Sequence, residues 1–226
     1  MTPAGLRAGD VGGSLGEART PRASAELWYA WVGHHAPDVD RLTADLLSRE
    51  EQRRRDTYRS REAAERYVVT RSLVRVVLSR LLRISPRDVP LSRTDAGKPI
   101  VAGAVHFNVS HSGDLIVLAV SRQCDVGVDV ERRRTVDRVA ELSRRWLTDE
   151  ERSAVANARA TSADHSDAFL RVWTTKEARL KALGVGISGG GAAGKLDAVD
   201  VLPLDDVLSR LDAGAGRGYV GAIAFA

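Results

Sequence analysis

The stretch that decides the fold is GVDVERRR, residues 127–134. From Val126 onward, valines alternate with other residues, which predicts a β-strand because successive side chains of a strand point to opposite faces. The valines then share one face that can pack into a core. Gly127, Asp129 and Glu131 share the other face, so the strand carries two acids side by side.

These two acids predict a cation site. Their positions along the strand differ by about 6.6 Å, so both carboxylates can reach one ion, and their mutual repulsion favours a cation between them. Oxygen ligands suit Mg²⁺, which usually keeps waters and phosphates in its other positions. Gly127 leaves a gap where a ligand could approach. The alternative is an exposed sheet face with solvated acids, and the arginines at 132–134 could balance them, bind an anionic partner or face solvent.

Length and composition are typical of a soluble globular protein. The chain has 226 residues, enough for one large domain or two small ones, with 43% hydrophobic and 28% charged residues. No apolar stretch is long enough to span a membrane, and no secretory signal is visible. A single cysteine, Cys124, fits a reducing compartment. We therefore expect a cytoplasmic protein without a membrane partner.

The charge favours an anionic partner. The net charge is +4 and the isoelectric point is about 9.6, which suits nucleotides, phosphates, nucleic acid or an acidic protein. Arginines far outnumber lysines, of which there are four. Because a lysine is a compact charge that differs chemically from arginine, each of the four is a candidate for a specific role. They are Lys98, Lys176, Lys181 and Lys195.

Hydrophobic periodicity predicts alternating strands and helices. Residues 1–22 are rich in Gly, Ala and Arg and are expected to form a disordered tail. Strands are expected at 26–32, 105–113, 115–120 and 127–131, with further strands flanking a short helix near the C-terminus. Helices are expected at about 39–56, 60–82, 136–146 and 166–183, and Thr148 with Glu151 predicts a capping box. The glycine-rich segment 186–195 is expected to be flexible, and its spacing does not fit a nucleotide-binding loop.

A second group of polar residues lies in WTTKEARLKALG, residues 173–184. Trp173, Glu177 and Lys181 are four residues apart, so they share one face of the expected helix. One interpretation is a surface Glu–Lys pair. The other is a third carboxylate and a cation beside a phosphate, and spacing alone does not decide between them.

A third group is NVSHS, residues 108–112, at the end of an expected strand. His111 there is either a hydrogen-bonded surface residue or part of a functional site. A Ser-His-Asp triad is a weak alternative, because the sequence has no G-x-S-x-G motif around a nucleophile.

Taken in order, GKP, FNVSHSG, GVDVE and WTTKEARLKALG resemble the surfactin-type 4′-phosphopantetheinyl transferases. The resemblance covers roughly residues 45–187. It implies Mg²⁺-dependent transfer of 4′-phosphopantetheine from coenzyme A to a serine of an apo acyl or peptidyl carrier protein, with adenosine 3′,5′-bisphosphate as the other product. Fatty-acid, polyketide and non-ribosomal peptide carriers all remain open as substrates.

The resemblance also implies roles for individual residues. The metal ligands would be Asp129, Glu131 and Glu177, and Glu177 or Lys181 would be the base for the serine hydroxyl. Asp129 and His111 are further catalytic candidates. The residues expected to bind coenzyme A, chiefly its phosphates, are Arg66, Lys98, Pro99, Ser110, His111, Asp129, Lys176 and Lys181.

For the fold, the resemblance implies an α+β protein of two similar halves related by a pseudo-two-fold axis, each an antiparallel sheet packed with a long helix. The halves would be residues 23–123 and 124–226, after the tail at 1–22, and the protein would be a monomer. The basic region around 132–147 would dock the acidic carrier protein. The chain departs from the family pattern in two places: the glycine-rich segment 186–194 is looser than the pattern, and the 1–22 tail has no counterpart in it.

Two other functions remain open from the residues. Paired acids with basic helices also suit a metal-dependent phosphodiesterase or nuclease. A non-catalytic module that binds coenzyme A or a carrier protein is the third possibility. The acids at 129, 131 and 177 argue against such a module, because pure binding needs no metal.

Overall fold

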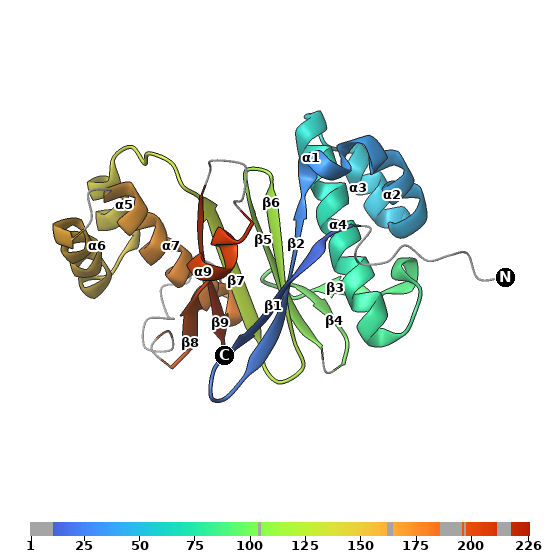
Figure 1. The fold of residues 1–226 in the computed structure, drawn as a ribbon. Helices are drawn as coiled ribbons and strands as arrows, with labels where there is room; N and C mark the ends of the chain where they lie inside the picture. The colour runs from blue at the N-terminus through green and yellow to red at the C-terminus, as the bar shows by residue number, and fades with distance from the viewer. Residues whose placement is uncertain (1–10, 104, 162–164, 186–195, 197, 212–217) are drawn as a thin grey trace.

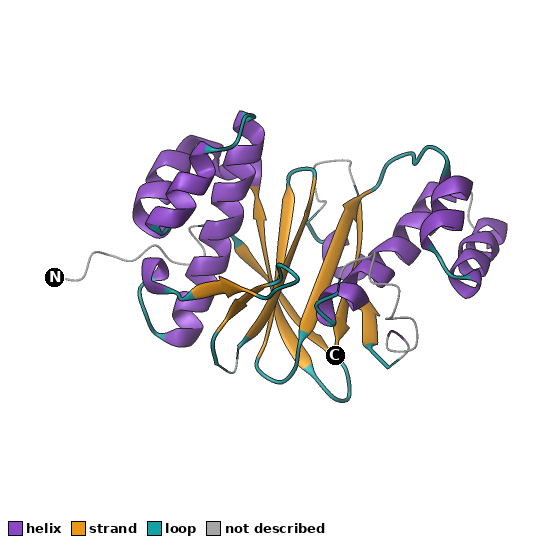
Figure 2. Cartoon of the chain, turned by 180° about the vertical axis from the view of Figure 1, so that it is seen from behind, coloured by secondary structure: helices purple, strands orange, loops and turns teal. Residues whose placement is uncertain are grey.

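The structure, a computed structural model, describes residues 11–103, 105–161, 165–185, 196, 198–211 and 218–226. Two antiparallel sheets lie at the centre, with helices on both sides (Figures 1 and 2). The first sheet has the order β1-β2-β6-β5 and the second has the order β7-β9-β8. Their strands are β1 (Gly13–Arg19), β2 (Ser24–Trp31), β5 (His106–Ser112), β6 (Leu115–Ser121), β7 (Val126–Arg132), β8 (Asp200–Pro203) and β9 (Tyr219–Phe225). A small hairpin pairs β3 (Leu91–Arg93) with β4 (Pro99–Val101).

The helices form two groups, one beside each sheet (Figure 1). The first group consists of α1 (Val32–His35), α2 (Val39–Leu46), α3 (Arg49–Asp56) and α4 (Arg61–Leu82). The second consists of α5 (Val139–Trp146), α6 (Asp149–Thr161), α7 (His165–Ala182) and α9 (Asp205–Ser209). Two 3₁₀ turns, Ala36–Asp38 and Pro86–Asp88, connect elements of the first half.

The elements stack in four layers, in the order α4, first sheet, second sheet, α7. Alternate side chains of strand β6 pack into two different hydrophobic cores. Ile116 and Leu118 pack with α4, whereas Leu115 and Val117 pack with the second sheet. The valines of β7 lie in that same second core, as their alternation predicted. The expected α+β architecture of antiparallel sheets with long helices is therefore confirmed, while the pseudo-two-fold and the boundary between 123 and 124 stay predictions.

Gly127 determines how α7 approaches the second sheet. A Cβ atom at this position would lie 2.1 Å from the carbonyl oxygen of Ala178 and 2.3 Å from the nitrogen of Ala182. The helix backbone, rather than a ligand, thus fills the gap that the glycine leaves, which corrects the expectation from sequence. This close approach brings α7 onto the face of β7 that carries Asp129 and Glu131.

Three other expectations about local structure need correction. Residues 13–19 form strand β1 at the edge of the first sheet, so the tail expected over 1–22 is wrong there; residues 1–10 lie outside the described part. The helix expected at 39–56 is two helices, because Ser48 caps a new helix through a capping box with Glu51. Helix α5 begins at Val139 rather than near 136, after Arg138 in a left-handed conformation.

Two further expectations have simple outcomes. The capping box of Thr148 and Glu151 is present, with both reciprocal hydrogen bonds. The glycine-rich segment 186–195 falls outside the described residues. In the part of the chain that the structure describes, no helix is long and apolar enough to cross a membrane.

Candidate active site

One open cavity of about 320 Å³ gathers residues from all three sequence motifs. Strand β5, strand β7 and helix α7 each contribute three of its lining residues. They are Val109, Ser110, His111, Asp129, Val130, Glu131, Trp173, Glu177 and Lys181. The shared helix face predicted for Trp173, Glu177 and Lys181 is therefore the face that meets the strand acids.

Asp129 is the most enclosed acid of the cavity, with 7% of the residue exposed. Its Oδ1 atom accepts hydrogen bonds from Nζ of Lys181 at 2.6 Å and from the Ser110 hydroxyl at 2.8 Å. Burial raises the pKa of Asp129 above its ordinary value, although Lys181 and Ser110 act in the opposite direction. The carboxylate is therefore held in place while its charge remains poorly solvated.

Lys181 is fixed by three oxygen atoms. Besides Asp129, its Nζ atom donates to the Ser110 hydroxyl and to the carbonyl oxygen of Val128, both at 3.2 Å. The ammonium group thus lies at the wall of the cavity as the cation nearest to Asp129. The Glu177–Lys181 pair is part of the cavity rather than a solvated pair on an outer surface.

The other two acids of the cavity have different surroundings: Glu131 accepts two hydrogen bonds, whereas Glu177 has a raised pKa. Oε2 of Glu131 accepts from the Ser112 hydroxyl at 2.7 Å and from Arg134 at 2.9 Å. Burial raises the pKa of Glu177, and the negative charge of Asp129 raises it further. A carboxyl group of raised pKa beside a cavity is a better proton acceptor than an ordinary one.

His111 lies at the rim of the cavity. The surrounding protein withdraws water from the ring and lowers the pKa of His111, and the nearby charges of Arg66 and Lys181 lower it further. The imidazole is therefore neutral near pH 7 and can donate a hydrogen bond without carrying a charge. Arg66, on α4, is thus electrostatically close to this rim.

The three acids match the donor chemistry of Mg²⁺ but do not form a closed ligand set. They supply only oxygen atoms to one cavity, and the charge of Asp129 destabilises ionised Glu177 in a way that a cation would relieve. Within the described ranges, no three His, Cys, Asp or Glu side chains are already arranged to hold a metal ion. Closing the set would require side-chain movement.

Two predicted phosphate-binding lysines lie elsewhere. Nζ of Lys98, next to Pro99 in the turn before β4, donates to Asp125 at 3.1 Å and to the carbonyl oxygen of Ala182 at 3.0 Å. Nζ of Lys176 pairs with Glu151 at 2.8 Å and so ties α6 to α7. Neither lysine is among the residues that line the cavity.

The arginine run after β7 is mostly engaged within the protein. Arg133 pairs with Asp167 and, at 3.2 Å, with Asp205, and Arg171 bridges the same two acids. Arg134 pairs with Glu131. Arg134 therefore balances one of the two strand acids, as one of the alternatives from sequence expected, whereas Arg133 balances acids of α7 and α9.

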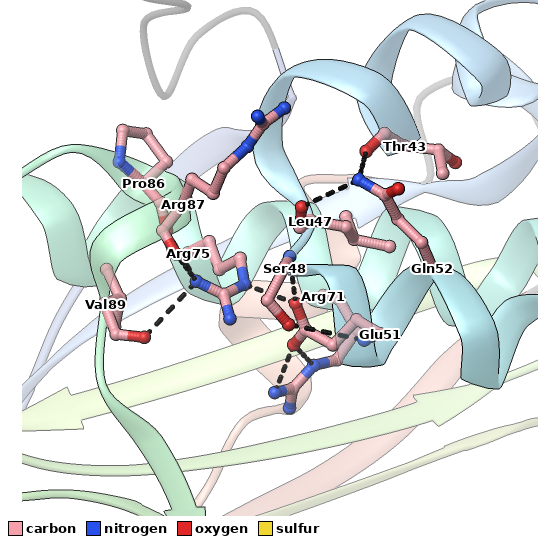
Figure 3. Close-up of polar contacts among 10 residues, drawn as sticks. All are labelled: Thr43, Leu47, Ser48, Glu51, Gln52, Arg71, Arg75, Pro86, Arg87 and Val89. Carbon is pink, nitrogen blue, oxygen red and sulfur yellow. Dashed lines mark hydrogen bonds and ion pairs between the residues drawn. The ribbon is translucent and has the colours of Figure 1, made fainter.

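A second cavity, of about 750 Å³, was missed by the sequence reasoning. It lies between α3, α4 and β3, and arginines dominate its polar lining: Arg54, Arg71, Arg75 and Arg93. Glu51 pairs with Arg71 and Arg75, and Arg75 also donates to backbone carbonyl oxygens of the 3₁₀ turn (Figure 3). The basic run on α3 was the available signal, but nothing in the sequence pattern joined it to Arg93.

Burial alone would raise the pKa of Glu51, but Arg71, Arg75 and the backbone N–H of Ser48 together hold it below its ordinary value. Glu51 therefore stays ionised and partly neutralises the positive charge of Arg71 and Arg75. Arg93 donates to the carbonyl oxygen of Gly97 at 2.9 Å, and Arg54 lies over the ring of Tyr58. Arg54 and Arg93 have no acidic partner among the described residues, although Glu50 also lines the cavity. With four arginines against two glutamates, the lining is net basic and suits an anion.

Two family models match consecutive parts of the chain. The 4′-phosphopantetheinyl transferase superfamily model matches residues 125–213, and the model of the N-terminal part of 4′-phosphopantetheinyl transferases matches residues 36–123. Together they span more than half of the sequence and both sides of the cavity. The chain belongs to the 4′-phosphopantetheinyl transferase superfamily.

Individual relatives agree with this assignment. A phosphopantetheinyl transferase of Thraustochytrium sp. is 33% identical over 185 residues, which are 75% of this chain and 64% of the relative. The 4′-phosphopantetheinyl transferase Sfp of Bacillus subtilis is 28% identical over 168 residues, 74% of this chain and 67% of the relative. An L-aminoadipate-semialdehyde dehydrogenase-phosphopantetheinyl transferase of Xenopus laevis is 31% identical, over 65% of this chain and 52% of the relative. The chain thus spans less than two thirds of the first and third of these proteins.

Proposed function

We propose that this protein transfers 4′-phosphopantetheine from coenzyme A to a serine of an apo carrier protein. The observation that carries the proposal is the meeting of Asp129, Glu131, Glu177 and Lys181 around one cavity, in a chain of this superfamily. Carboxylates for a divalent cation and an ammonium group for a phosphate are what transfer from a diphosphate requires.

In the reaction, the serine oxygen forms a bond to the β-phosphorus of coenzyme A, and the bond from that phosphorus to the bridging oxygen breaks. Adenosine 3′,5′-bisphosphate leaves with the electron pair, and the serine proton passes to a base. Asp129, Glu131 and Glu177 would hold Mg²⁺, which when bound would neutralise charge on the diphosphate. We assign the proton to Glu177, directly or through a water molecule, because its carboxylate lines the cavity beside the strand acids; Lys181 is the second candidate.

The remaining residues bind and orient the coenzyme. Lys181 offers its ammonium group to the diphosphate, and neutral His111 offers a hydrogen bond from the rim. Ser110 remains a candidate phosphate contact, although its hydroxyl already donates to Asp129. Lys176 is the weakest phosphate candidate, because its ammonium group pairs with Glu151 and the residue does not line the cavity.

The 3′-phosphate needs a separate cationic site. The turn that carries Lys98 and Pro99 also carries Gly97, which Arg93 of the arginine-lined cavity contacts. We therefore propose that Lys98, Arg93 and Arg54 receive the 3′-phosphate side of coenzyme A. The resemblance implies that Arg66 also contacts the 3′-phosphate, but its charge acts on His111 at the rim of the first cavity. We therefore propose Arg66 for the diphosphate side instead.

The protein partner is proposed to be an acidic acyl or peptidyl carrier protein. Arg144 and Arg145 are exposed on α5, and Arg145 lies over the ring of Trp146. This basic and aromatic surface suits the acidic helix of a carrier through electrostatic steering. We further propose a cytoplasmic, monomeric enzyme of the surfactin type that recognises no nucleic acid.

The test is incubation of the full chain with Mg²⁺, coenzyme A and a panel of apo carriers, followed by mass spectrometry of each carrier. A mass gain of one phosphopantetheine is expected, and Asp129→Asn should reduce its rate by at least about 100-fold. Asp45→Asn, an exposed acid of α2 that lies outside both the cavity and the basic region 132–147, is the matched control and should keep the wild-type rate. No gain on any carrier, or full activity of Asp129→Asn, would reject the proposal.

A further inference from the structure

Strands β5 and β7 are joined by side chains. The backbone N–H groups of Val128, Val130 and Arg132 donate to side-chain oxygens of Asn108, Ser110 and Ser112, at 3.0, 3.3 and 3.0 Å. The separation is 20 residues in each case, so the two strands run in the same direction and in constant register. We call these three contacts the β5–β7 seam.

The two serines of the seam make a second hydrogen bond that the asparagine does not. The hydroxyl of Ser112 donates to Oε2 of Glu131 at 2.7 Å, and that of Ser110 donates to Oδ1 of Asp129 at 2.8 Å. A hydroxyl has one hydrogen and two lone pairs. Because the backbone N–H occupies one lone pair, the direction of the hydroxyl hydrogen is restricted. Each acid therefore accepts a hydrogen bond from a hydroxyl that the backbone of β7 keeps in place.

The donors converge on one oxygen of each acid. Oε2 of Glu131 accepts hydrogen bonds from Ser112 and Arg134. Oδ1 of Asp129 accepts hydrogen bonds from Ser110 and Lys181. Among the residues that the structure describes, no donor reaches Oε1 of Glu131 or Oδ2 of Asp129. One oxygen of each carboxylate is thus used for positioning, and the other is left for a ligand.

We propose that Ser112 is a positioning residue, which fixes the Glu131 carboxylate so that its Oε1 atom is left for a divalent cation. This inference rests on the proposed function and adds to it a residue that does not itself touch metal or substrate. Arg134 is a weaker restraint on the same oxygen, because its side chain is 48% exposed and an exposed ion pair holds geometry poorly. Ser112 is less exposed and is anchored by the backbone of β7.

The test measures cation affinity without turnover. Mn²⁺ is titrated into the full-length protein and free Mn²⁺ is followed by electron paramagnetic resonance, for wild type, Ser112→Ala, Ser112→Thr and Ser121→Ala. Ser121 is a matched control, because it is a buried serine of β6 that accepts from the backbone N–H of Gln123 and, among the residues that the structure describes, makes no hydrogen bond to an acid. Circular dichroism and thermal unfolding establish that each variant is folded.

Ser112→Ala should weaken Mn²⁺ binding by about tenfold, as loss of a residue that orients a ligand typically does. Ser112→Thr, which keeps the hydroxyl, should restore affinity to within about threefold, and Ser121→Ala should match wild type. Equal affinity in folded Ser112→Ala, an equal loss in Ser121→Ala, or a wild type that binds no Mn²⁺ would overturn the inference. If the predicted Mn²⁺ pattern holds but no carrier gains mass, the proposed function fails while the positioning role of Ser112 stands.

Discussion

Gly127 and Ala178 meet so closely that a methyl group does not fit between them: a Cβ atom at residue 127 would lie 2.1 Å from the carbonyl oxygen of Ala178. The obstacle is helix backbone, which cannot rotate away as a side chain can. The contact therefore fixes the distance between α7 and β7, on which the position of Glu177 over the strand acids depends.

Gly127→Ala should accordingly push α7 away from the sheet. We expect the free energy of unfolding to fall by about 3 kcal/mol, at the upper end for overpacking, because backbone must move. Urea unfolding followed by circular dichroism measures this. Gly33→Ala is the control, since its Cβ would meet only side-chain atoms of Asp114, at 3.3 Å or more. Equal stability of the two variants would contradict the close packing.

Glu51 is expected to make stability depend on pH. It is buried between Arg71 and Arg75, and its pKa is below its ordinary value of 4.5. A group with a lowered pKa stabilises the folded state above its unfolded pKa, and this contribution disappears as pH falls through the folded pKa.

Glu51→Gln should therefore cost about 3 kcal/mol at pH 7, because it leaves the buried charge of Arg75 without its partner. The difference from wild type should shrink as pH falls below 4.5, the ordinary pKa of the side chain. Urea midpoints at several pH values provide the measurement. Exposed Glu50→Gln, one residue away, should change stability by less than about 0.5 kcal/mol. A pH-independent difference for Glu51→Gln would be inconsistent with the lowered pKa.

Lys176 allows a test between a structural and a phosphate-binding role. Its Nζ atom lies 2.8 Å from Glu151, so Lys176→Gln and Glu151→Gln should each reduce stability by about 1 kcal/mol, and the double variant should lose less than the sum. If the lysine serves only this pair, both variants should retain similar transfer rates. A rate lost only in Lys176→Gln, together with a raised KM for coenzyme A, would instead favour phosphate binding.

The basic surface of α5 should affect the carrier but not the coenzyme. Reversing both charges, Arg144→Glu with Arg145→Glu, should lower kcat/KM for an acidic carrier by about tenfold at low salt, and the effect should weaken as salt is added. The KM for coenzyme A should stay unchanged. Arg80→Glu, an exposed reversal on α4, is the control. A similar loss from Arg80→Glu would point to overall charge rather than to a docking surface.

The sequence predicted those features that depend on short-range pattern. Alternation from Val126 to Glu131 gave the correct strand, its buried valine face and its acidic face. Helical spacing correctly put Trp173, Glu177 and Lys181 on one face, and all three line the cavity. Each of these inferences needed only the geometry of a single element.

Features that depend on tertiary contacts were beyond such reasoning. Gly127 was expected to admit a ligand, but the backbone of a helix some fifty residues later in the chain occupies that space. Strand β1 has weak strand propensity by itself and is held by pairing with β2. The arginine-lined cavity lies between α3, α4 and β3. The periodicity of a single element does not predict which other elements it will contact.

The constant separation of 20 residues across the β5–β7 seam has a consequence for how such chains can vary in length. If one residue were added to the link at 122–125 and β7 shifted by one position along β5, its valines would lie opposite the serine hydroxyls and both acids would turn toward the hydrophobic core. Insertions and deletions should thus be tolerated in surface loops elsewhere but excluded between the serine-rich strand and the acidic one.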